Sequence, residues 1–227
     1  DIAAVADALA RMIGEGCALD LDSLPEEACG PLAAALSEYG VDLHVEEHAV
    51  SAIVSLPDTF DGYLGMLSKK QRHEVRRKRR RYEDVLGEVV HEVHHEPDWA
   101  FDEFIRLHRL SEGEKGQFMT PQREAFFATL VQLEGWRLDV LRVPDTDRAA
   151  ASLFSFSDDE AIYLYNSAYD PGLADASPGI AIVGTLIEQA ITEGLPRFDF
   201  LKGDESYKFR LGAEPRPLYR ISAGVSS

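Results

Sequence analysis

The stretch from Ala161 to Lys208 constrains the fold most, because it predicts a strand, a helix and a second strand in succession. The run AIYLYNSAY alternates apolar and tyrosine residues, which is typical of a strand, and Asp170-Pro171-Gly172 predicts the turn that ends it. A helix is expected next, because Ile182, Leu186, Ile187, Ala190 and Ile191 recur at helical spacing. Residues 197–201 then predict the second strand.

The start of this helix is the first candidate site. Ser177 offers a hydroxyl at the N-cap position, and Pro178 and Gly179 follow in the first turn. A helix N-terminus presents backbone N–H groups and a partial positive charge, which together suit a phosphate group. The alternative is a helix start that is simply capped and binds nothing.

Five motifs in the chain carry a family resemblance: LPDTFDGYLGMLSKKQRHEVRRKRRR (56–81), LH (107–108), YNSAYDP (165–171), SPG (177–179) and FDFLKGDESYK (198–208). With them, residues 55–212 resemble the CelD-like, FemAB-related branch of the GNAT acyltransferase superfamily. The resemblance implies a V-shaped sheet whose central strands part to admit an acyl thioester. It also implies that the carrier, coenzyme A or an aminoacyl-tRNA, lies at the helix that starts near Ser177.

The expected fold class is therefore α+β (α/β): a GNAT-like mixed, mostly antiparallel sheet with helices on both faces. Residues 58–227 are expected to form the acyltransferase domain. Residues 1–57 predict helix, strand, helix and two paired strands (41–47 and 50–56), which echoes the second half of a GNAT unit. Because the chain begins with Asp1 instead of Met, we expect it to be a fragment whose first unit is truncated.

Composition limits the function classes. The chain has 227 residues, 45% hydrophobic content and two cysteines, which excludes a disulfide framework or a four-thiolate metal site. No apolar run is long enough to span a membrane and no secretory signal is visible, so a cytoplasmic protein without membrane association is expected. Residues 91–95 contain three histidines, but their alternation along a strand favours exposed polar residues over a metal site.

A basic helix is predicted over residues 60–85. Between Lys69 and Arg81 there are nine Lys or Arg and one Glu, a net charge of +8. Because the whole chain has a net charge of −17, the residues outside this segment carry −25. This helix is either a solvated face that pairs with the acidic body or an anion-binding wall in which Arg76 and Arg80 bind the substrate. The acidic remainder disfavours a broad nucleic-acid surface.

The remaining pattern predicts a strand (87–95), a helix (98–112), a loop from Glu112 to Met119 that could act as a lid, and a helix capped by Thr120. Phe126, Phe127, Leu130 and Val131 are expected to face inward from that helix. Two strands follow (137–143 and 149–158). Together with the strand at 161–169 they predict an antiparallel meander, followed by the helix and the parallel strand. A short helix (205–211) and a closing strand (218–223) end the chain.

Direct attack of an amine on a bound thioester needs no enzyme nucleophile, and the chain shows no nucleophile motif. The catalytic candidates follow the last strand of the stretch: Asp204 could deprotonate or orient the amine, Tyr207 could protonate the departing thiolate, and Lys208 could neutralise negative charge. The substrate-binding candidates are His108 of the LH motif, Tyr165, Asp170 and Asp199. For Asp170 a turn role, and for Asp204 a favourable position in the first helical turn, remain alternatives.

The predicted function is transfer of an acyl group from acetyl-CoA or another acyl-CoA to an amine of a small molecule or sugar, without a metal. Residues 174–179 lack the glycine-rich Q/R-x-x-G-x-G/A pattern of many acetyl-CoA-binding relatives. An aminoacyl-tRNA donor therefore stays open, as does a non-catalytic scaffold whose basic helix binds a partner.

Overall fold

The computed structural model describes residues 1–111 and 113–224, and the chain divides into two compact units. The first comprises residues 1–52, 202–206 and the segment from Glu214 onward; the second comprises residues 53–201 and 207–213. The sequence prediction instead placed one boundary after residue 57. The closing strand joins the N-terminal segment because it pairs with it in an antiparallel ladder, Leu19 opposite Ala223. That residues 1–57 derive from a truncated GNAT unit stays a prediction.

The first unit packs two helices against strands in the order β1-β8-β2. Its elements are α1 (Ile2–Gly14), β1 (Leu19–Pro25), α2 (Glu26–Glu38), most of β2 (His44–Ser55) and β8 (Glu214–Ala223). Ala6, Leu36 and Ile221 are fully buried in its core. The expectation of paired strands at 41–47 and 50–56 is wrong: β2 is one strand, because His48-Ala49 contains no turn-forming residue.

The second unit is a sheet in the order β7-β6-β5-β4-β3 with helices on both faces. Its strands are β3 (Val90–His94), β4 (Trp136–Arg142), β5 (Ala149–Ser157), β6 (Ala161–Tyr169) and most of β7 (Arg197–Lys202). The predicted antiparallel meander of β4, β5 and β6 is confirmed, as is the parallel pairing of β6 with β7. Elsewhere in the described residues of this unit, β3 pairs antiparallel with β4.

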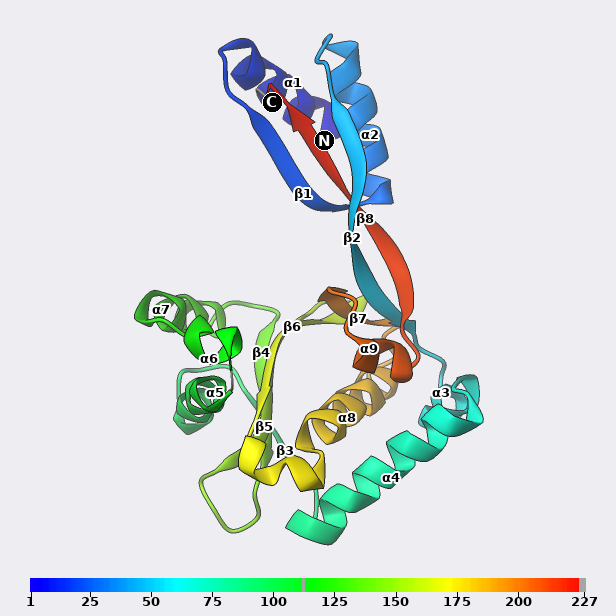
Figure 1. Cartoon of the computed structure of the whole chain (residues 1–227), viewed down its shortest axis with the longest axis vertical. Helices are drawn as coiled ribbons and strands as arrows, with labels where there is room; N and C mark the ends of the chain where they lie inside the picture. Colours follow the sequence, from blue (N-terminus) through cyan, green and yellow to red (C-terminus); the bar gives the residue numbers. More distant parts are fainter. Residues whose placement is uncertain (112, 225–227) are drawn as a thin grey trace. The chain divides into compact units, whose positions relative to one another are not determined.

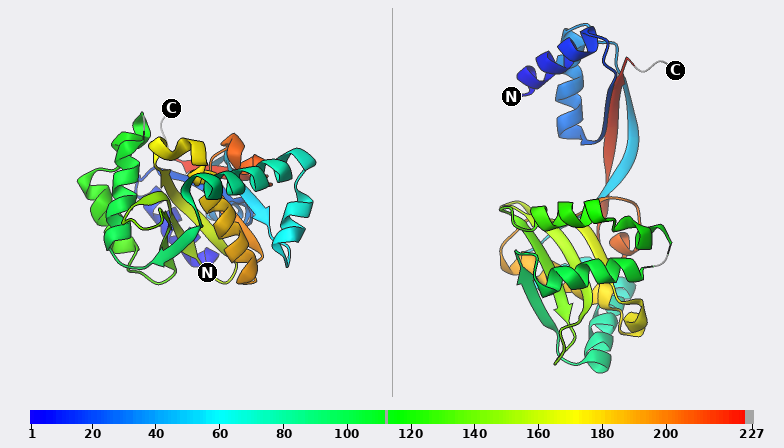
Figure 2. Two further views of the ribbon diagram at one scale, coloured as in Figure 1. Left: turned by 90° about the horizontal axis from the view of Figure 1, so that it is seen from below. Right: turned by 90° about the vertical axis from the view of Figure 1, so that its left-hand side faces the viewer.

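The helices of the second unit surround this sheet. They are α3 (Phe60–Met66), α4 (Lys69–Leu86), α5 (Trp99–Leu110), α6 (Glu114–Phe118), α7 (Pro121–Leu130), the 3-10 helix η1 (Pro171–Ala176), α8 (Pro178–Thr192) and most of α9 (Ser206–Arg210). Figures 1 and 2 show α5 and α7 on one face of β4 and β5 and α8 on the other. The predicted lid segment contains α6, and its first residue, Glu112, lies outside the described residues.

The core between α5, α7 and the sheet is aromatic. Phe104 is fully buried and its ring contacts those of Phe127 and Phe154 at centroid distances of 5.2 and 5.5 Å. Phe127 and Val131 face inward as predicted, but Phe126 does not and is 48% exposed. The reason is the helical period: Phe126 lies one residue, and so about 100°, away from the buried stripe.

The predicted basic helix is two helices. Ser68 caps α4 with a capping box: its Oγ accepts the Gln71 N–H at 3.3 Å, and Gln71 Oε1 accepts the Ser68 N–H at 2.9 Å. This reciprocal pair starts a new helix and separates α4 from α3. The predicted range 60–85 is corrected accordingly.

One tyrosine of α4 predicts an alkaline dependence of stability. Tyr82 is fully buried, its hydroxyl has no hydrogen-bond partner in the described part of the chain, and burial raises its pKa to about 12. An unfolded tyrosine ionises near pH 10, so the unfolded state releases its proton first and stability falls as pH rises from about 10 to 12. Tyr82→Phe should remove this loss and raise the free energy of unfolding at pH 7 by about 1 kcal/mol. Urea denaturation at pH 7 and at about pH 11 measures both effects.

Tyr63 supplies the matched control. It is also buried, burial raises its pKa, and its hydroxyl donates to the Leu211 carbonyl at 2.8 Å. Tyr63→Phe should therefore lower stability at pH 7 by about 0.5–1.5 kcal/mol. Equal losses in the two variants would contradict the difference between an unpartnered and a bonded hydroxyl.

Candidate functional site

The site is organised by two parallel strands that part. β6 and β7 pair only at their first residues: Ala161 with Arg197, Ile162 with Phe198 and Tyr163 with Asp199. β6 then continues to Tyr169 without further pairing to β7. The ladder between the two strands therefore ends at the pair Tyr163–Asp199. This is the opening that the family resemblance implies.

A β-bulge lies where the strands part. Phe154 of β5 is opposite Asn166, whereas the next residue, Ser155, is opposite Leu164, so Tyr165 is an extra residue in β6. A bulge interrupts the ladder locally and reorients the residues around it. Tyr165, a predicted substrate-binding residue, is 45% exposed here, and its ring contacts those of Phe127 and Trp136.

His108 supports this bulge from inside. Its ring is fully buried, with Nδ1 2.9 Å from the Phe104 carbonyl oxygen and Nε2 2.8 Å from Asn166 Oδ1. The Ser167 N–H donates to the same Oδ1 at 2.8 Å. The sequence prediction expected His108 to contact substrate, but the structure places it among protein groups that hold Asn166. Nothing in the sequence pattern singled out Asn166.

The far end of β7 turns sharply. Asp199 is 8% exposed, and its Oδ1 accepts the Leu201 N–H at 2.7 Å, while Leu201 has a φ of 55°. A left-handed leucine is strained, and the Asp199 bond stabilises it. Lys208 is buried and donates to the Phe200 carbonyl at 3.3 Å, and the ring of Tyr207 packs against that of Phe200. These predicted site residues thus gather along β7, within the second unit.

The start of α8 offers fewer amides than expected. Ser177 is left-handed (φ 56°) and makes no side-chain cap bond, so the predicted capping hydroxyl is wrong. Its carbonyl accepts the N–H groups of both Ile180 and Ala181 at 3.1 Å. Pro178 has no N–H, so the Gly179 N–H remains as the donor at this helix start in the described structure. A Cβ on Gly179 would lie 3.2 Å from the ring of Tyr169.

Basic side chains accompany this helix start, because α4 lies against η1 and α8 (Figure 1). Arg81 Nε donates to the Asp175 carbonyl at 3.3 Å, two residues before Ser177. Arg79 pairs with Glu188 at 2.7 Å, so part of the positive charge is used in holding α4 to α8. Arg77 is also engaged within α4, since its hydrogen bonds to Glu74 lower the pKa of that carboxyl group.

The two cations predicted to bind the substrate remain on the exposed face of α4. Arg76 reaches Asp61 only at 3.9 Å, and Arg80 is exposed and has no ion pair among the described residues. Some cations of the basic helix thus pair with acidic residues and others face solvent, and substrate binding by Arg76 and Arg80 stays a prediction.

Asp170 is held by a charge network that the sequence analysis missed. Its Oδ2 accepts from Arg106 Nη1 at 3.0 Å and its Oδ1 from the Gly172 N–H at 2.9 Å. Arg106 also forks onto Glu103 with two bonds of 2.7 Å. Burial by itself would raise the pKa of Glu103, but the bonds from Arg106 and from the Ala149 N–H lower it. Asp170 anchors the turn here, and a substrate contact stays a prediction.

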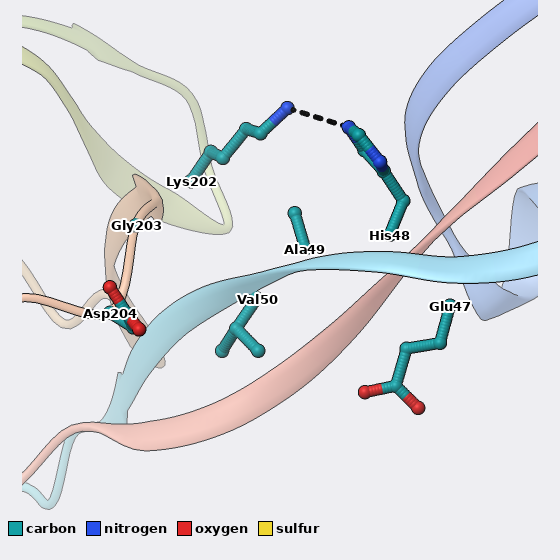
Figure 3. A pocket seen from close by; sticks show the side chains of 7 residues that line it. All are labelled: Glu47, His48, Ala49, Val50, Lys202, Gly203 and Asp204. Atoms are coloured by element: carbon teal, nitrogen blue, oxygen red, sulfur yellow. Dashed lines mark hydrogen bonds between the residues drawn. The ribbon is translucent and has the colours of Figure 1, made fainter.

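Asp204 lies in the first unit, in a groove of about 450 Å³. Figure 3 shows this groove, to which β2, the last residue of β7 and the two residues after it contribute. It is lined by Glu47, His48, Ala49, Val50, Lys202, Gly203 and Asp204. The Gly203 N–H donates to the Val50 carbonyl at 2.8 Å, which fixes the backbone before Asp204. The sequence analysis named Asp204 but not the β2 wall of the groove, since strand pairing across 150 residues leaves no local signal.

Two other kinds of site have no counterpart in the described structure. Among the described residues, no group of three or more His, Cys, Asp or Glu side chains could hold a metal ion. No helix in residues 1–111 or 113–224 has the length and apolar character required to cross a membrane.

A mixed sheet with one pair of diverging parallel strands defines a GNAT-like fold. The family model described as acetyltransferase (GNAT) domain matches residues 69–209, more than half of the 227 residues. The chain therefore belongs to this acetyltransferase family, and the expected relationship to the GNAT superfamily is confirmed. No curated protein matches the sequence.

Three solved structures illustrate the likeness in fold. A conserved protein of unknown function from Bacteroides thetaiotaomicron has a TM-score of 0.70 at 13% identity, over 98% of this chain and 75% of that one. L-PGS from Bacillus licheniformis has a TM-score of 0.67 at 16% identity, over 98% and 73%. FemX has a TM-score of 0.65 at 11% identity, over 97% and 77%. At these identities the similarity shows the fold alone.

Proposed function

We propose that this acyltransferase moves an acyl group from an acyl-coenzyme A thioester to an amine of a small molecule or sugar by direct attack. The observation that carries the proposal is the parting of β6 from β7 beside the bulge at Tyr165. In this proposal a backbone N–H group beyond the last pair, Tyr163 with Asp199, polarises the carbonyl of a thioester inserted there. Removing one such donor costs about 2.7–4 kcal/mol of barrier in other enzymes.

The reaction needs no covalent enzyme intermediate. The amine nitrogen forms a bond to the carbonyl carbon, the carbon–sulfur bond breaks, the amine loses one proton and the thiolate gains one. In this proposal Asp204 takes the amine proton and Tyr207 supplies the proton of the thiol. Lys208 stabilises negative charge near β7, consistent with its bond to the Phe200 carbonyl. Positioning both reactants can lower the barrier by about 7–11 kcal/mol.

The carrier phosphates are assigned to the start of α8. The Gly179 N–H and the positive end of the helix favour an anion, and α4 adds the neighbouring cation Arg81. Arg80 is exposed on the same helix and completes the proposed contact with the substrate. Ser177 and Pro178 shape the turn that holds Gly179 in place.

Gly179→Val tests the donor. The added side chain enters space next to the Tyr169 ring and covers the one amide at this helix start, so acetyl-CoA affinity should fall at least tenfold by isothermal titration calorimetry. Gly30→Val is the matched control, since Gly30 also lies in a helix but has open space around it. Equal affinity in the two variants, or no acetyl-CoA binding by the wild-type protein, would refute the coenzyme A donor.

An aminoacyl-tRNA donor is the second candidate, favoured by the shortage of amides at α8 and the exposed cations of α4. It predicts tRNA binding that weakens steeply with salt and is lost when Arg76, Arg77 and Arg80 are all replaced by glutamine. A chain that binds neither donor would instead support the scaffold alternative.

A further inference from the structure

A short segment joins β6 to the helix whose start is assigned to the carrier phosphates. This segment is η1 (Pro171–Ala176), yellow in Figure 1, and it leads through Ser177 into α8. Of its six residues, all of them described by the structure, Ala176 alone is buried. Because so little apolar surface anchors η1, polar contacts determine its position. At its far end the exposed Arg81 donates to the Asp175 carbonyl at 3.3 Å.

Arg106 of α5 holds the start of the segment. Its Nη1 donates to Asp170 Oδ2 at 3.0 Å, and its Nε and Nη2 each donate to one carboxylate oxygen of Glu103 at 2.7 Å. Nη2 also donates to the Ala149 carbonyl of β5 at 3.2 Å. One planar guanidinium thus joins α5, β5 and the residue before η1, which the ammonium group of a lysine does not reproduce.

These charged groups are largely withdrawn from water. The side chains of Arg106 and Asp170 are 21% and 19% exposed, and that of Glu103 is 10% exposed. Burial by itself would lower the pKa of Arg106, but the hydrogen bonds to Glu103 and Asp170 raise it. Partly buried ion pairs are screened by salt much less than exposed ones, so this contact restrains the chain more firmly than a surface pair does.

Asp170 transmits this restraint toward α8. Its Oδ1 accepts the Gly172 N–H at 2.9 Å and its carbonyl accepts the Leu173 N–H at 3.0 Å, so the first turn of η1 is built on this residue. On the other side of Asp170 lies Tyr169, whose ring is 3.2 Å from the position that a Cβ on Gly179 would take. A displacement of Asp170 therefore moves two parts of the chain that adjoin the start of α8.

We propose that Arg106 is a positioning residue of the carrier site: through Asp170 it keeps η1, and with it the Gly179 N–H, in the place where a phosphate group is bound. The role for the carrier rests on the proposed function, whereas the restraint on η1 does not. Without the restraint, Gly179 is correctly placed in only a fraction of the molecules, and the apparent affinity falls by that fraction.

Asp170→Asn is the main test. It removes the charge that Arg106 binds but keeps an amide oxygen to accept the Gly172 N–H. Acetyl-CoA affinity should fall about tenfold by isothermal titration calorimetry. The Leu173 amide, which bonds within the first turn of η1, should exchange its hydrogen at least tenfold faster by nuclear magnetic resonance.

Glu160→Gln is the matched control. Glu160 lies just before β6, at the opposite end of the strand from Asp170, and accepts from Arg197 Nη2 at 2.8 Å. The variant therefore also removes the carboxylate of an arginine pair within the second unit. It should leave both the acetyl-CoA affinity and the exchange of the Leu173 amide unchanged.

Arg106→Met tests the other partner, and the double variant with Asp170→Asn tests the coupling between them. The double variant should bind acetyl-CoA about as weakly as the weaker single variant, because the same restraint is removed only once. Thermal unfolding checks that each variant is folded. Arg106→Met leaves Glu103 without its guanidinium, so Asp170→Asn, which keeps that pair, decides the question if Arg106→Met does not fold.

Three results would overturn the proposal: wild-type acetyl-CoA affinity in folded Asp170→Asn, unchanged exchange of the Leu173 amide in that variant, or losses that multiply in the double variant. Multiplied losses would mean that Asp170 contacts the carrier independently of Arg106. Failure of the proposed donor gives a different result, since the wild-type chain would then not bind acetyl-CoA. Faster exchange at Leu173 would in that case still support the restraint on η1, and only the donor would be refuted.

Discussion

Replacing Asp139 with leucine is expected to destabilise the fold by about 3–5 kcal/mol, because it leaves the buried guanidinium of Arg137 without its carboxylate partner. Asp139 is fully buried and accepts from Arg137 Nε at 2.8 Å and from His91 at 2.7 Å. Arg137 is only 7% exposed and also donates to Gln189 of α8 at 2.9 Å. The measurement is equilibrium unfolding in urea.

The matched variant removes both charges. Arg137→Met combined with Asp139→Leu leaves no buried ion, so the double variant should lie much closer to the wild type than either single variant. A double variant as unstable as the sum of the single variants would show that the pair itself, and not the avoidance of a lone buried charge, stabilises this part of the sheet.

Phe104→Ala is expected to cost about 3–5 kcal/mol, since it opens a cavity at the centre of the aromatic core. The ring is fully buried and contacts Phe101, His108, Phe127 and Phe154. Because the lost ring also packs against that of His108 at a centroid distance of 4.4 Å, acyl-transfer activity should fall along with stability. The midpoint of thermal unfolding and the free energy of unfolding report the first effect.

Phe126→Ala provides the comparison within the same aromatic region. Its ring touches Phe127 but is 48% exposed, so the substitution should change stability by about 1 kcal/mol or less. A loss equal to that of Phe104→Ala would mean that α7 is not oriented as described here.

Local chemistry made much of the fold predictable. The apolar period of α8 stops before Gly194 and Pro196, and the turn that ends β6 is marked by Asp170-Pro171-Gly172, so both have short-range signals. The errors arise where a local signal was overlooked or absent. Ser68 and Gln71 form a recognisable capping box, so the break between α3 and α4 could have been read from the sequence. The single strand β2 follows from the missing turn at His48.

The site was less predictable because its key contacts join distant segments. His108 and Asn166 are 58 residues apart and Arg137 and Gln189 52 apart, and no periodicity indicates either pair. The number of free backbone N–H groups at the start of α8 was partly predictable, since Pro178 has no N–H to donate. What the sequence could not show is that the Ser177 carbonyl engages two of the remaining N–H groups.

Tyr165, the extra residue of the β-bulge, determines how β6 can vary in length. Tyr163 and Tyr165 contact rings on the α7 side of the sheet, and Asn166 reaches His108 on that same side. Side chains therefore alternate between the two faces of the sheet on each side of Tyr165, and the alternation shifts by one residue at that position. An insertion or deletion of one residue elsewhere in the strand would turn every side chain beyond it to the other face of the sheet, whereas Tyr165 can be gained or lost without exchanging the faces of its neighbours.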